Sequence, residues 1–492
     1  MPLHIEEIQY LKNTCAHLDD AYTSLKSTFD TSQKENVILQ EENKKLKICI
    51  ELLQYEKEEL ERSQKLNSSN SSKPPSSDGF KKQKRTKSLK EPTTEKPGRK
   101  KGCKTTTLRQ VSNPDKITNL KKDHYCTCCN LNLDEIPLSK KYTKRQKFDF
   151  PEPKIEVTEF RLFKKKCPGC KTTILPPCEI NGRVEYGKKI SSLSGYLSGE
   201  QLIPLKRISL YFKSLYNSSL CGATVNTINK KLSKLCKNQI EKIKEYLEKS
   251  KIKHLDETGF RMEGESAWLH SMSNKEATLY TPSKKRGDVP IEARGIVVHD
   301  NYCSYNKIKE AVHATCNVHH LRELQALKEI EKESWSKYMF NLLKIGNKRK
   351  TQSKEIPISK KYIAKYISLY NKIIKKGLEF HINLKPLPSK FPKRKKRRRG
   401  HNLLERLKKN KEKVLLFLKK EEVPFSNNQA ERDIRMMKLK QKISGGFRKE
   451  EGAKIFCNIK SLISTLSKQK MNTLENLEKL LNGKLDLKLT PI

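Results

Sequence analysis

Leucine recurs every seven residues through the first part of the chain, and this repeat constrains the fold more than any other feature. Ser32 is the single exception in the series Leu11, Leu18, Leu25, Leu39, Leu46, Leu53 and Leu60. Such a repeat places apolar side chains along one seam of a helix, as in a two-stranded coiled coil. It predicts a coiled-coil helix over residues 1–66 that makes the protein a homo-oligomer. A long helix packed on its own chain is the alternative.

The charge of the chain indicates a polyanionic partner. Lys and Arg outnumber Asp and Glu by 104 to 56, a formal net charge of +48. No apolar run is long enough to span a membrane and no signal-peptide pattern is present, so we expect nucleic acid as the partner, no membrane, and a cytoplasmic location. Residues 67–120 are predicted to be a flexible linker with a basic arm at 81–101, which either follows phosphates or only solubilises the chain.

Two CxxC knuckles follow the linker. They are Cys126-Thr-Cys-Cys129 and Cys167-Pro-Gly-Cys170, with strand-like alternation between them. Two such pairs at this spacing are typical of a structural zinc ribbon with four thiolate ligands. We expect a DNA-binding zinc ribbon over residues 121–185, with Zn²⁺ on Cys126, Cys129, Cys167 and Cys170. A redox pair is the weaker alternative, because no thioredoxin-like context surrounds either motif.

Residues 186–250 have the apolar spacing of helices. Two amphipathic segments, Leu205–Leu215 and Val225–Leu235, flank a turn at 217–222. This arrangement, with Lys230 and Lys231 on the second segment, fits a helix-turn-helix that reads DNA. A helix pair that merely packs is the alternative interpretation.

From residue 251 the apolar period changes from helical to strand-like. Strand patterns occupy residues 252–257, 267–272, 277–280, 295–300 and 312–318, and a helical pattern follows at 319–330. Three antiparallel strands, a connection, a fourth strand and alternating helices match a ribonuclease-H-like sheet. In such a sheet the acidic ends of the first and fourth strands lie side by side, which would bring Asp256 next to Asp300.

A third acid is expected from a late helix that crosses these strand ends. Glu431 lies about one turn inside a helix that Ser426 or Asn427 can cap. Three carboxylates offer hard oxygen ligands for two Mg²⁺ ions, with Mn²⁺ as an alternative. Two such ions roughly 3.5–4 Å apart can activate an attacking oxygen and stabilise a leaving one. The predicted catalytic and magnesium-binding residues are therefore Asp256, Asp300 and Glu431.

These motifs together resemble transposases of the insertion sequence 66 family over nearly the whole chain. The matching stretches are 67–78, the two knuckles, 255–258, 299–302, 313–319, 427–432, 444–452 and 461–465. The resemblance implies a DDE transposase, with Asp256, Asp300 and Glu431 as its acids. Such enzymes cleave DNA at terminal inverted repeats and join the freed 3′-hydroxyl to target DNA. On the helix of Glu431, we expect Asn427 and Asn428 either to orient the carboxylate or to contact a phosphate, and Arg432 and Arg435 to contact DNA. The resemblance also implies a bacterial cytoplasm near the nucleoid.

One stretch departs from the family pattern. The chain has Cys316-Asn-Val-His319 where the family usually has Cys-Trp-Ala-His. The lost aromatic residue touches no carboxylate. We interpret Cys316 and His319 as packing residues rather than metal ligands, because the sequence shows no second ligand pair nearby.

The stretch between Asp300 and Glu431 is longer than the sheet needs, which predicts an α-helical insertion over about 331–420. A run of cations within it is expected to clamp DNA phosphates, with an exposed loop as the alternative: Lys393, Arg394, Lys395, Lys396, Arg397, Arg398 and Arg399.

The combined prediction is a multidomain α+β protein. Its parts are the coiled coil, the linker, the zinc ribbon, the helical region, a ribonuclease-H-like α/β catalytic domain over 251–470, and a C-terminal helix and tail over 471–492. The expected partner is double-stranded DNA, as terminal repeats and as target. Accessory proteins of the same element are further candidates. The rival functions are a catalytically inactive zinc-ribbon DNA-binding protein and a nuclease that cuts without joining.

Overall fold

The computed structural model describes residues 3–67, 70–71, 108–120, 124–137, 142–180, 182–289, 292–352, 357–388 and 396–489. The predicted basic arm at 81–101 and the cations Lys393, Arg394 and Lys395 lie outside these residues. The chain divides into two compact units. The larger comprises residues 1–84, 186–205 and 223–492, and the smaller comprises 85–185 and 206–222.

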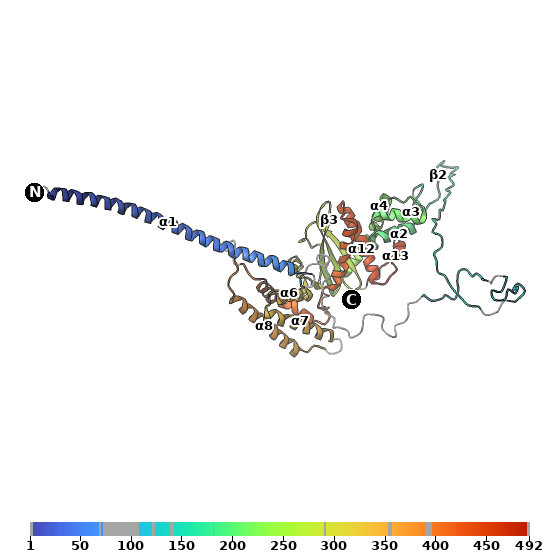
Figure 1. Cartoon of the computed structure of the whole chain (residues 1–492). Helices are drawn as coiled ribbons and strands as arrows, with labels where there is room; N and C mark the ends of the chain where they lie inside the picture. Colours follow the sequence, from blue (N-terminus) through green and yellow to red (C-terminus); the bar gives the residue numbers. More distant parts are fainter. Residues whose placement is uncertain are drawn as a thin grey trace. The chain divides into compact units, whose positions relative to one another are not determined.

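The segment with the leucine repeat forms one helix of 63 residues, α1 (Leu3–Lys65) (Figure 1). Its leucine seam is open to solvent, with Leu25 73% exposed and Leu39 53% exposed. Burying such a seam against a second helix is what stabilises a coiled coil. The helix itself agrees with the prediction, and its pairing with a second chain stays a prediction.

A mixed five-stranded sheet forms the centre of the larger unit. Its strands are β3 (Ile252–Met262), β4 (Glu265–Ser273), β5 (Thr278–Ser283), β6 (Gly295–His299) and β7 (Ala311–Thr315), in the order β5-β4-β3-β6-β7. The first three are antiparallel, and β6 and β7 run parallel to β3. Residues 263 and 264 both have positive φ, as a two-residue hairpin turn requires. The mixed sheet with many helices confirms the predicted α+β class.

Strand β3 is longer than predicted. The sequence pattern was interpreted as a strand that ends on Asp256 and Glu257, but β3 continues to Met262. The continuation pairs with β4 over its whole length, from His254 opposite Ser273 to Met262 opposite Glu265. In contrast, the parallel pairing of β3 with β6 ends at His254. The acidic residues therefore follow the end of the parallel ladder rather than the end of the strand.

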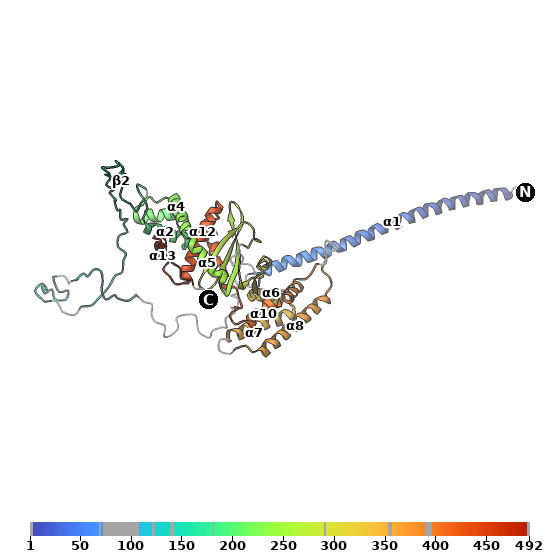
Figure 2. The same cartoon turned by 180° about the vertical axis from the view of Figure 1, so that it is seen from behind.

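Helices cover the sheet in two groups, each with its own apolar core. Residues of β6 and β7, among them Ile296, Val298 and Ala314, form one core with the helices between the second and third acids. These helices are α6 (Asn317–Glu329), α7 (Ser334–Gln352), α8 (Lys360–Ile382), α9 (Arg399–Lys409) and α10 (Lys411–Lys419) (Figures 1 and 2). Helices thus occupy the segment of the predicted insertion. The predicted strand at 312–318 is shorter, because α6 already begins at Asn317.

The second core joins β3, β4 and β5 to α11 (Asn428–Ser444) and α12 (Glu450–Lys468). Helix α12 also covers the edge strand β5. The hydroxyl of Ser461 accepts the N–H of Tyr280 at 2.9 Å, and that of Thr465 accepts the N–H of Thr278 at 3.1 Å. An uncovered edge strand can pair with another chain and aggregate. These bonds occupy N–H groups of β5 and so protect the edge of the sheet.

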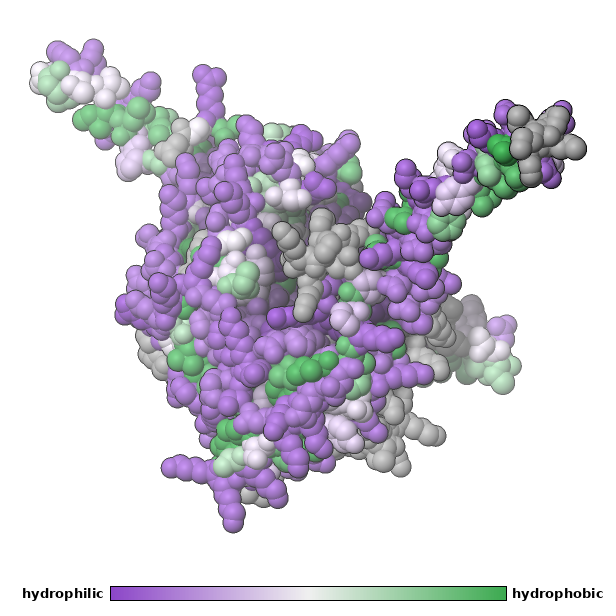
Figure 3. All heavy atoms as spheres, turned by 90° about the vertical axis from the view of Figure 1, so that its left-hand side faces the viewer, coloured by the Kyte–Doolittle hydropathy of each residue, from purple (hydrophilic) through white to green (hydrophobic). Residues whose placement is uncertain are grey.

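The remaining helices are α2 (Lys188–Gly199), α3 (Leu205–Tyr216), α4 (Gly222–Leu235), α5 (Lys237–Lys249) and α13 (Thr473–Leu481). Helices α3 and α4 occupy the two segments predicted as a helix pair; α3 lies almost wholly in the smaller unit and α4 in the larger. The face drawn in Figure 3 is mostly hydrophilic, as expected from the charge of the chain. Within the described residues, no helix combines the length and apolarity that crossing a bilayer requires.

Candidate active site

The register of β3 and β6 brings the first two predicted acids together. Ile252 lies opposite Ile296 and His254 opposite Val298 in the parallel ladder. Continued two residues further, the same register sets Asp256 beside Asp300. Both side chains are half-buried.

The loop after β6 holds Asp300 through backbone hydrogen bonds. An Asp300 carboxylate oxygen accepts the N–H of Tyr302 at 2.9 Å, and Asn301 has a φ of 73°. The N–H of Asn301 donates to Nδ1 of His299 at 3.0 Å, so Nε2 of His299 carries the proton and donates to His313 at 3.0 Å. Burial lowers the pKa of His299 to about 3, which keeps the His299 ring neutral. The sequence motif around His299 therefore has a structural role in shaping the loop.

Asn427 attaches the helix of Glu431 to β3. Its Nδ2 donates to the carbonyl of Leu255 at 2.7 Å, and its Oδ1 accepts from Nδ1 of His254 at 2.8 Å. Asn427 is the residue before α11, but its side chain does not cap the helix. With 1% of its surface exposed, it also has no surface for DNA. Of the two expected caps, Ser426 or Asn427, Asn427 does not cap the helix; both of its side-chain polar atoms are committed to the strand that carries Asp256.

The far end of α11 is attached to the same strand. Phe447 bridges Met262, with its N–H donating to the carbonyl of Arg261 at 2.9 Å. Gly446 lies so close that a Cβ atom there would meet the Arg261 carbonyl oxygen at 2.4 Å. Gly445 ends the helix with a φ of 72°. Helix α11 is thus held to β3 at both ends, and Glu431 lies in its first turn near the two aspartates.

Electrostatic interactions link the three acids, whereas within the described residues their carboxylate oxygens do not all lie within 4.8 Å of one another. Burial raises the pKa of Asp256 well above its usual value, and the charges of Glu257, Asp300 and Glu431 raise it further. A buried carboxylate among like charges is costly unless a cation or a proton compensates it. The donor set of Asp256, Asp300 and Glu431 is all oxygen, which fits Mg²⁺ or Mn²⁺.

Glu257 was not singled out from the sequence, and the structure separates it from Asp256. Adjacent residues of a strand point to opposite faces. The carboxylate of Glu257 accepts hydrogen bonds from Arg286 at 2.7 Å and from the hydroxyl of Tyr305, and only 1% of its side chain is exposed. Glu257 is therefore compensated by a cation of its own chain. Asp256 and Glu257 are equivalent candidates in the sequence, and the hydrogen bonds of Glu257 with Arg286 and Tyr305 distinguish them in the structure.

A pH-dependent stability is expected from Asp256. When a carboxyl has a higher pKa in the folded protein than in the unfolded chain, the protein loses stability as pH rises. The loss begins at the pKa of the unfolded chain, roughly 3.9, and continues through the pKa of the folded protein. Without divalent metal, Asp256→Asn should therefore raise the melting temperature at pH 8 by a few degrees, and the gain should vanish near pH 4. About 1 kcal/mol corresponds to about 2–4 °C in a domain of roughly 150–250 residues. Calorimetry with Asp288→Asn, at an exposed position, is the control; equal gains in both variants would contradict the assignment.

Cys316 and His319 lie beside the third acid, which the sequence did not indicate. Cys316 precedes α6, and its thiol is 3.9 Å from Oε1 of Glu431. Within the described part of the chain, donor atoms of Cys316, His319 and Glu431 lie within 4.8 Å of one another. Burial raises the pKa of the Cys316 thiol to about 12. The sequence showed no second ligand pair near these two residues, and the structure adds one single neighbouring ligand, Glu431.

The two CxxC knuckles form the same turn. In each, the N–H of the first cysteine donates to the carbonyl five residues on, and the carbonyl of that cysteine accepts from the N–H four residues on. The latter positions, Asn130 and Lys171, both have positive φ. The hydrogen bond with Thr172 lowers the pKa of Cys170 to about 7. The structure does not bring three or more of the four predicted thiols within 4.8 Å of one another, so the shared zinc stays a prediction.

The candidate DNA contacts are spread over several elements. Asn428, Arg432 and Arg435 are exposed on α11, the helix of Glu431. Lys230 on α4 pairs with Glu451, and Lys231 is exposed beside it. In the cation run, Arg397 is exposed, whereas Lys396 lies 4.2 Å from the ring of Tyr55 and Arg398 donates to the carbonyl of Lys385. Part of the run is therefore engaged within the chain.

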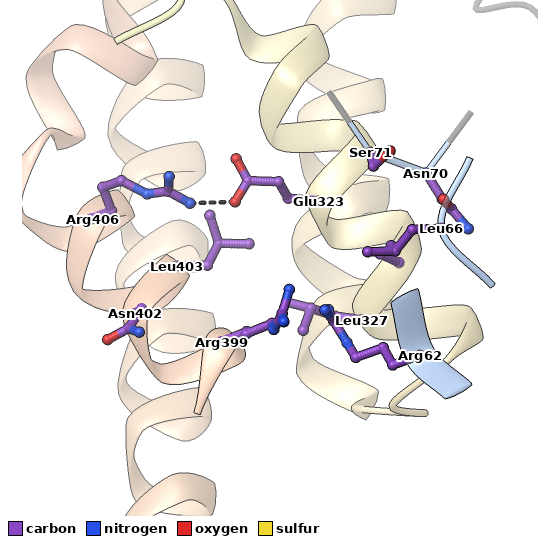
Figure 4. A pocket seen from close by; sticks show the side chains of 11 residues that line it. Arg62, Leu66, Asn70, Ser71, Glu323, Leu327, Arg399, Asn402, Leu403 and Arg406 are labelled. Carbon is purple, nitrogen blue, oxygen red and sulfur yellow. Dashed lines mark hydrogen bonds and ion pairs between the residues drawn. The ribbon is translucent and has the colours of Figure 1, made fainter. Parts of the chain in front are cut away.

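The end of α1 joins the unit that carries the acids. A pocket of about 430 Å³ lies there between α1, α6 and α9 and is lined by Arg62, Arg399 and Arg406 (Figure 4). Each of these arginines meets a carboxylate: Arg62 meets Glu331 at 2.6 Å, Arg399 meets Glu59 at 2.5 Å, and Arg406 meets Glu323. These ion pairs connect α1 with α9 and with the segment after α6, and they connect α9 with α6.

An α/β core with clustered carboxylates has the donor set of a divalent-cation-dependent enzyme. Comparison with protein families shows which one. Residues 184–455, more than half of the chain, match the family described as Transposase IS66 family, so the chain belongs to that family. This confirms the resemblance seen in the sequence. Membership makes the protein an enzyme of DNA transposition in general terms, with DNA as partner and divalent metal use in general.

A second match covers the N-terminal part. Residues 28–109 match a family of unknown function (DUF6444). These residues include the later half of α1 and most of the predicted linker. A comparison with curated proteins gave no match.

Proposed function

We propose that the protein is a DDE transposase whose catalytic acids are Asp256, Asp300 and Glu431. The observation that supports the proposal is how the segments of the three acids are held: the parallel register of β3 and β6 runs toward Asp256 and Asp300, and α11, which carries Glu431, is attached to β3 at both ends. A β5-β4-β3-β6-β7 sheet with three antiparallel and two parallel strands also has the order of a ribonuclease-H-like domain.

The three acids fit two Mg²⁺ ions, with Mn²⁺ as an alternative. Bound there, such ions supply Lewis-acid stabilisation of the attacking and leaving oxygens in an in-line displacement at a DNA phosphate. The residues of the chain do the rest. Asp300 is oriented by the loop of His299, Asn427 keeps α11 in place, and Arg286 and Tyr305 donate hydrogen bonds to Glu257.

The cation run of residues 393–399 is proposed to contact DNA phosphates. Each neutralised phosphate contributes about 0.9 to the slope of log K against log salt concentration. Replacing the seven cations with serine would lower this slope by about six if every one of them contacted a phosphate. We expect a smaller decrease, because Lys396 and Arg398 make contacts within the chain. Titrations of a labelled DNA duplex at several salt concentrations measure it. Serine at Lys375 and Lys376, exposed on α8, is the control; an equal loss there would remove the special role of the run.

Self-association through α1 is proposed from its exposed leucine seam. Deleting residues 1–52 leaves Tyr55, Glu59 and Arg62, whose contacts tie α1 to the larger unit. The particle mass by light scattering should fall from that of an oligomer to that of one chain, because most of the apolar seam is gone. A full-length protein that is already a monomer would refute coiled-coil pairing.

The zinc ribbon and the DNA-reading helix pair are proposed as DNA-binding parts. Their support is the identical turn at the two knuckles and the presence of helices at both predicted segments. Zinc would fold the knuckle region and would take no part in cleavage. The acids present at all three positions speak against an inactive DNA-binding derivative.

The direct test is incubation of the full chain with Mg²⁺ and DNA ending in the inverted repeats that flank its reading frame. We expect nicks at the repeat ends, products joined to target DNA, and loss of both with EDTA. Cleavage without joined products would favour the nuclease that only cuts. No cleavage by a folded, DNA-binding protein would support the inactive alternative.

A further inference from the structure

We propose that Cys316, His319 and Glu431 form a second metal site, selective for a borderline transition ion such as Zn²⁺ or Co²⁺. A sulfur, a ring nitrogen and a carboxylate oxygen suit such ions, whereas Mg²⁺ prefers oxygen alone. The three residues come from two elements: Cys316 and His319 lie at the start of α6, and Glu431 lies in the first turn of α11.

The spacing of the donors fits a tetrahedral ion. Zn²⁺ binds sulfur at about 2.3 Å and oxygen or nitrogen at about 2.0–2.2 Å, so two ligands of one ion stand roughly 3.5 Å apart. The Cys316 sulfur is 3.9 Å from Oε1 of Glu431, and the three donor atoms all lie within 4.8 Å of one another. The sulfur–oxygen distance is a few tenths of an ångström longer than this, and rotations about the side-chain bonds would bring all three donors to one ion. The fourth position is left to water.

The surroundings of Cys316 and His319 favour metal binding by both side chains. The sulfur of Cys316 accepts the backbone N–H of Asn427 at 3.1 Å, an interaction that favours a thiolate. Nδ1 of His319 is buried and has no hydrogen-bond partner in the described structure. A buried ring nitrogen without a partner is costly, and a metal bond would satisfy it. On binding, the thiol proton passes to solvent, since only the thiolate is a ligand.

This site shares Glu431 with the proposed magnesium site, and its consequence for activity rests on the proposed function. Zn²⁺ bound to Oε1 of Glu431, the oxygen near Cys316, would take that oxygen away from the Mg²⁺ ions. Zn²⁺ at Cys316 and His319 should therefore withdraw Glu431 and inhibit DNA cleavage, with Mg²⁺ in excess unable to restore it fully.

The test counts metal without using activity. Full-length protein is equilibrated with Co²⁺, dialysed, and analysed for cobalt per chain and for sulfur-to-cobalt absorption, in the absence of DNA. We expect Cys316→Ala and His319→Ala each to lose one equivalent relative to the wild type. Cys457→Ala removes another buried thiol, outside the cluster, and should lose none. Cys167→Ser removes a predicted ligand of the zinc ribbon, so its cobalt count measures the metal bound at the knuckles separately from the metal bound at Cys316.

The outcomes separate the two proposals. If the wild type and both cluster variants bind equal cobalt, the second metal site is refuted, whatever the protein does to DNA. If cobalt is lost as expected but no variant or wild type cleaves DNA, the site stands and the transposase proposal fails. Should Cys316→Ala not fold, judged by circular dichroism, His319→Gln supplies the same count, because His319 is only half-buried.

Discussion

Alanine at Asp256, Asp300 or Glu431 is expected to lower Mg²⁺-dependent cleavage of terminal-repeat DNA by at least about 10³-fold. Metal ions at such a site stabilise transition-state charge by several kcal/mol, and each 1.4 kcal/mol is about tenfold in rate. DNA affinity should stay within a few-fold, because the candidate phosphate contacts are exposed cations elsewhere on the chain. Initial cleavage rates and duplex binding, measured on the same preparations, check both halves of the expectation.

The matched controls are carboxylates outside the cluster. Glu451→Ala on α12 removes an exposed acid that pairs with Lys230, and surface pairs of this kind contribute little. Its cleavage rate should equal that of the wild type. Glu257→Gln tests the neighbour of Asp256, which the hydrogen bonds from Arg286 and Tyr305 assign to a supporting role. Wild-type cleavage by any one of the three alanine variants would remove that residue from the active site.

Asn427→Ala is expected to produce the second largest effect, although its side chain touches no substrate. The substitution leaves the carbonyl of Leu255 and Nδ1 of His254 without their partner, at about 1–3 kcal/mol for each buried group. It also releases the start of α11, so Glu431 shifts relative to the aspartates. A displacement of roughly 1 Å at a catalytic group can cost about 10²-fold in rate. We expect cleavage reduced by about 10²-fold together with a lower melting temperature.

Asn428→Ala is the control for this position. Asn428 is the next residue of the same helix start and is exposed, so its loss should leave stability unchanged. The positioning role is distinguished from simple destabilisation by measuring cleavage at a temperature where both variants are fully folded. Raising Mg²⁺ should then recover part of the Asn427→Ala rate but none of the Glu431→Ala rate. A fully active Asn427→Ala protein would show that the attachment of α11 to β3 is not needed.

Much of the site was visible in local sequence pattern. Alternation of apolar residues indicated the strands, and the acids after Leu255 and His299 agree with the register of β3 and β6. The pattern misplaced the end of β3, because Gly259 and Arg261 interrupt the apolar positions while backbone pairing with β4 continues. The role of Asn427 was also misjudged. An asparagine before a helix usually caps it, and nothing local reveals that a strand far away in the chain uses both of its polar atoms.

The amino-acid order alone determined which elements form, and that one acid falls on a strand, one follows a strand and one lies on a late helix, since periodicity and turn residues act over short stretches. The tertiary structure alone decided which of Asp256 and Glu257 is left without a compensating cation. It also decided that Cys316 meets Glu431, 115 positions further along the chain. These outcomes depend on charge, burial and hydrogen bonds between distant segments, and such interactions exist only once the sheet and its helices have packed.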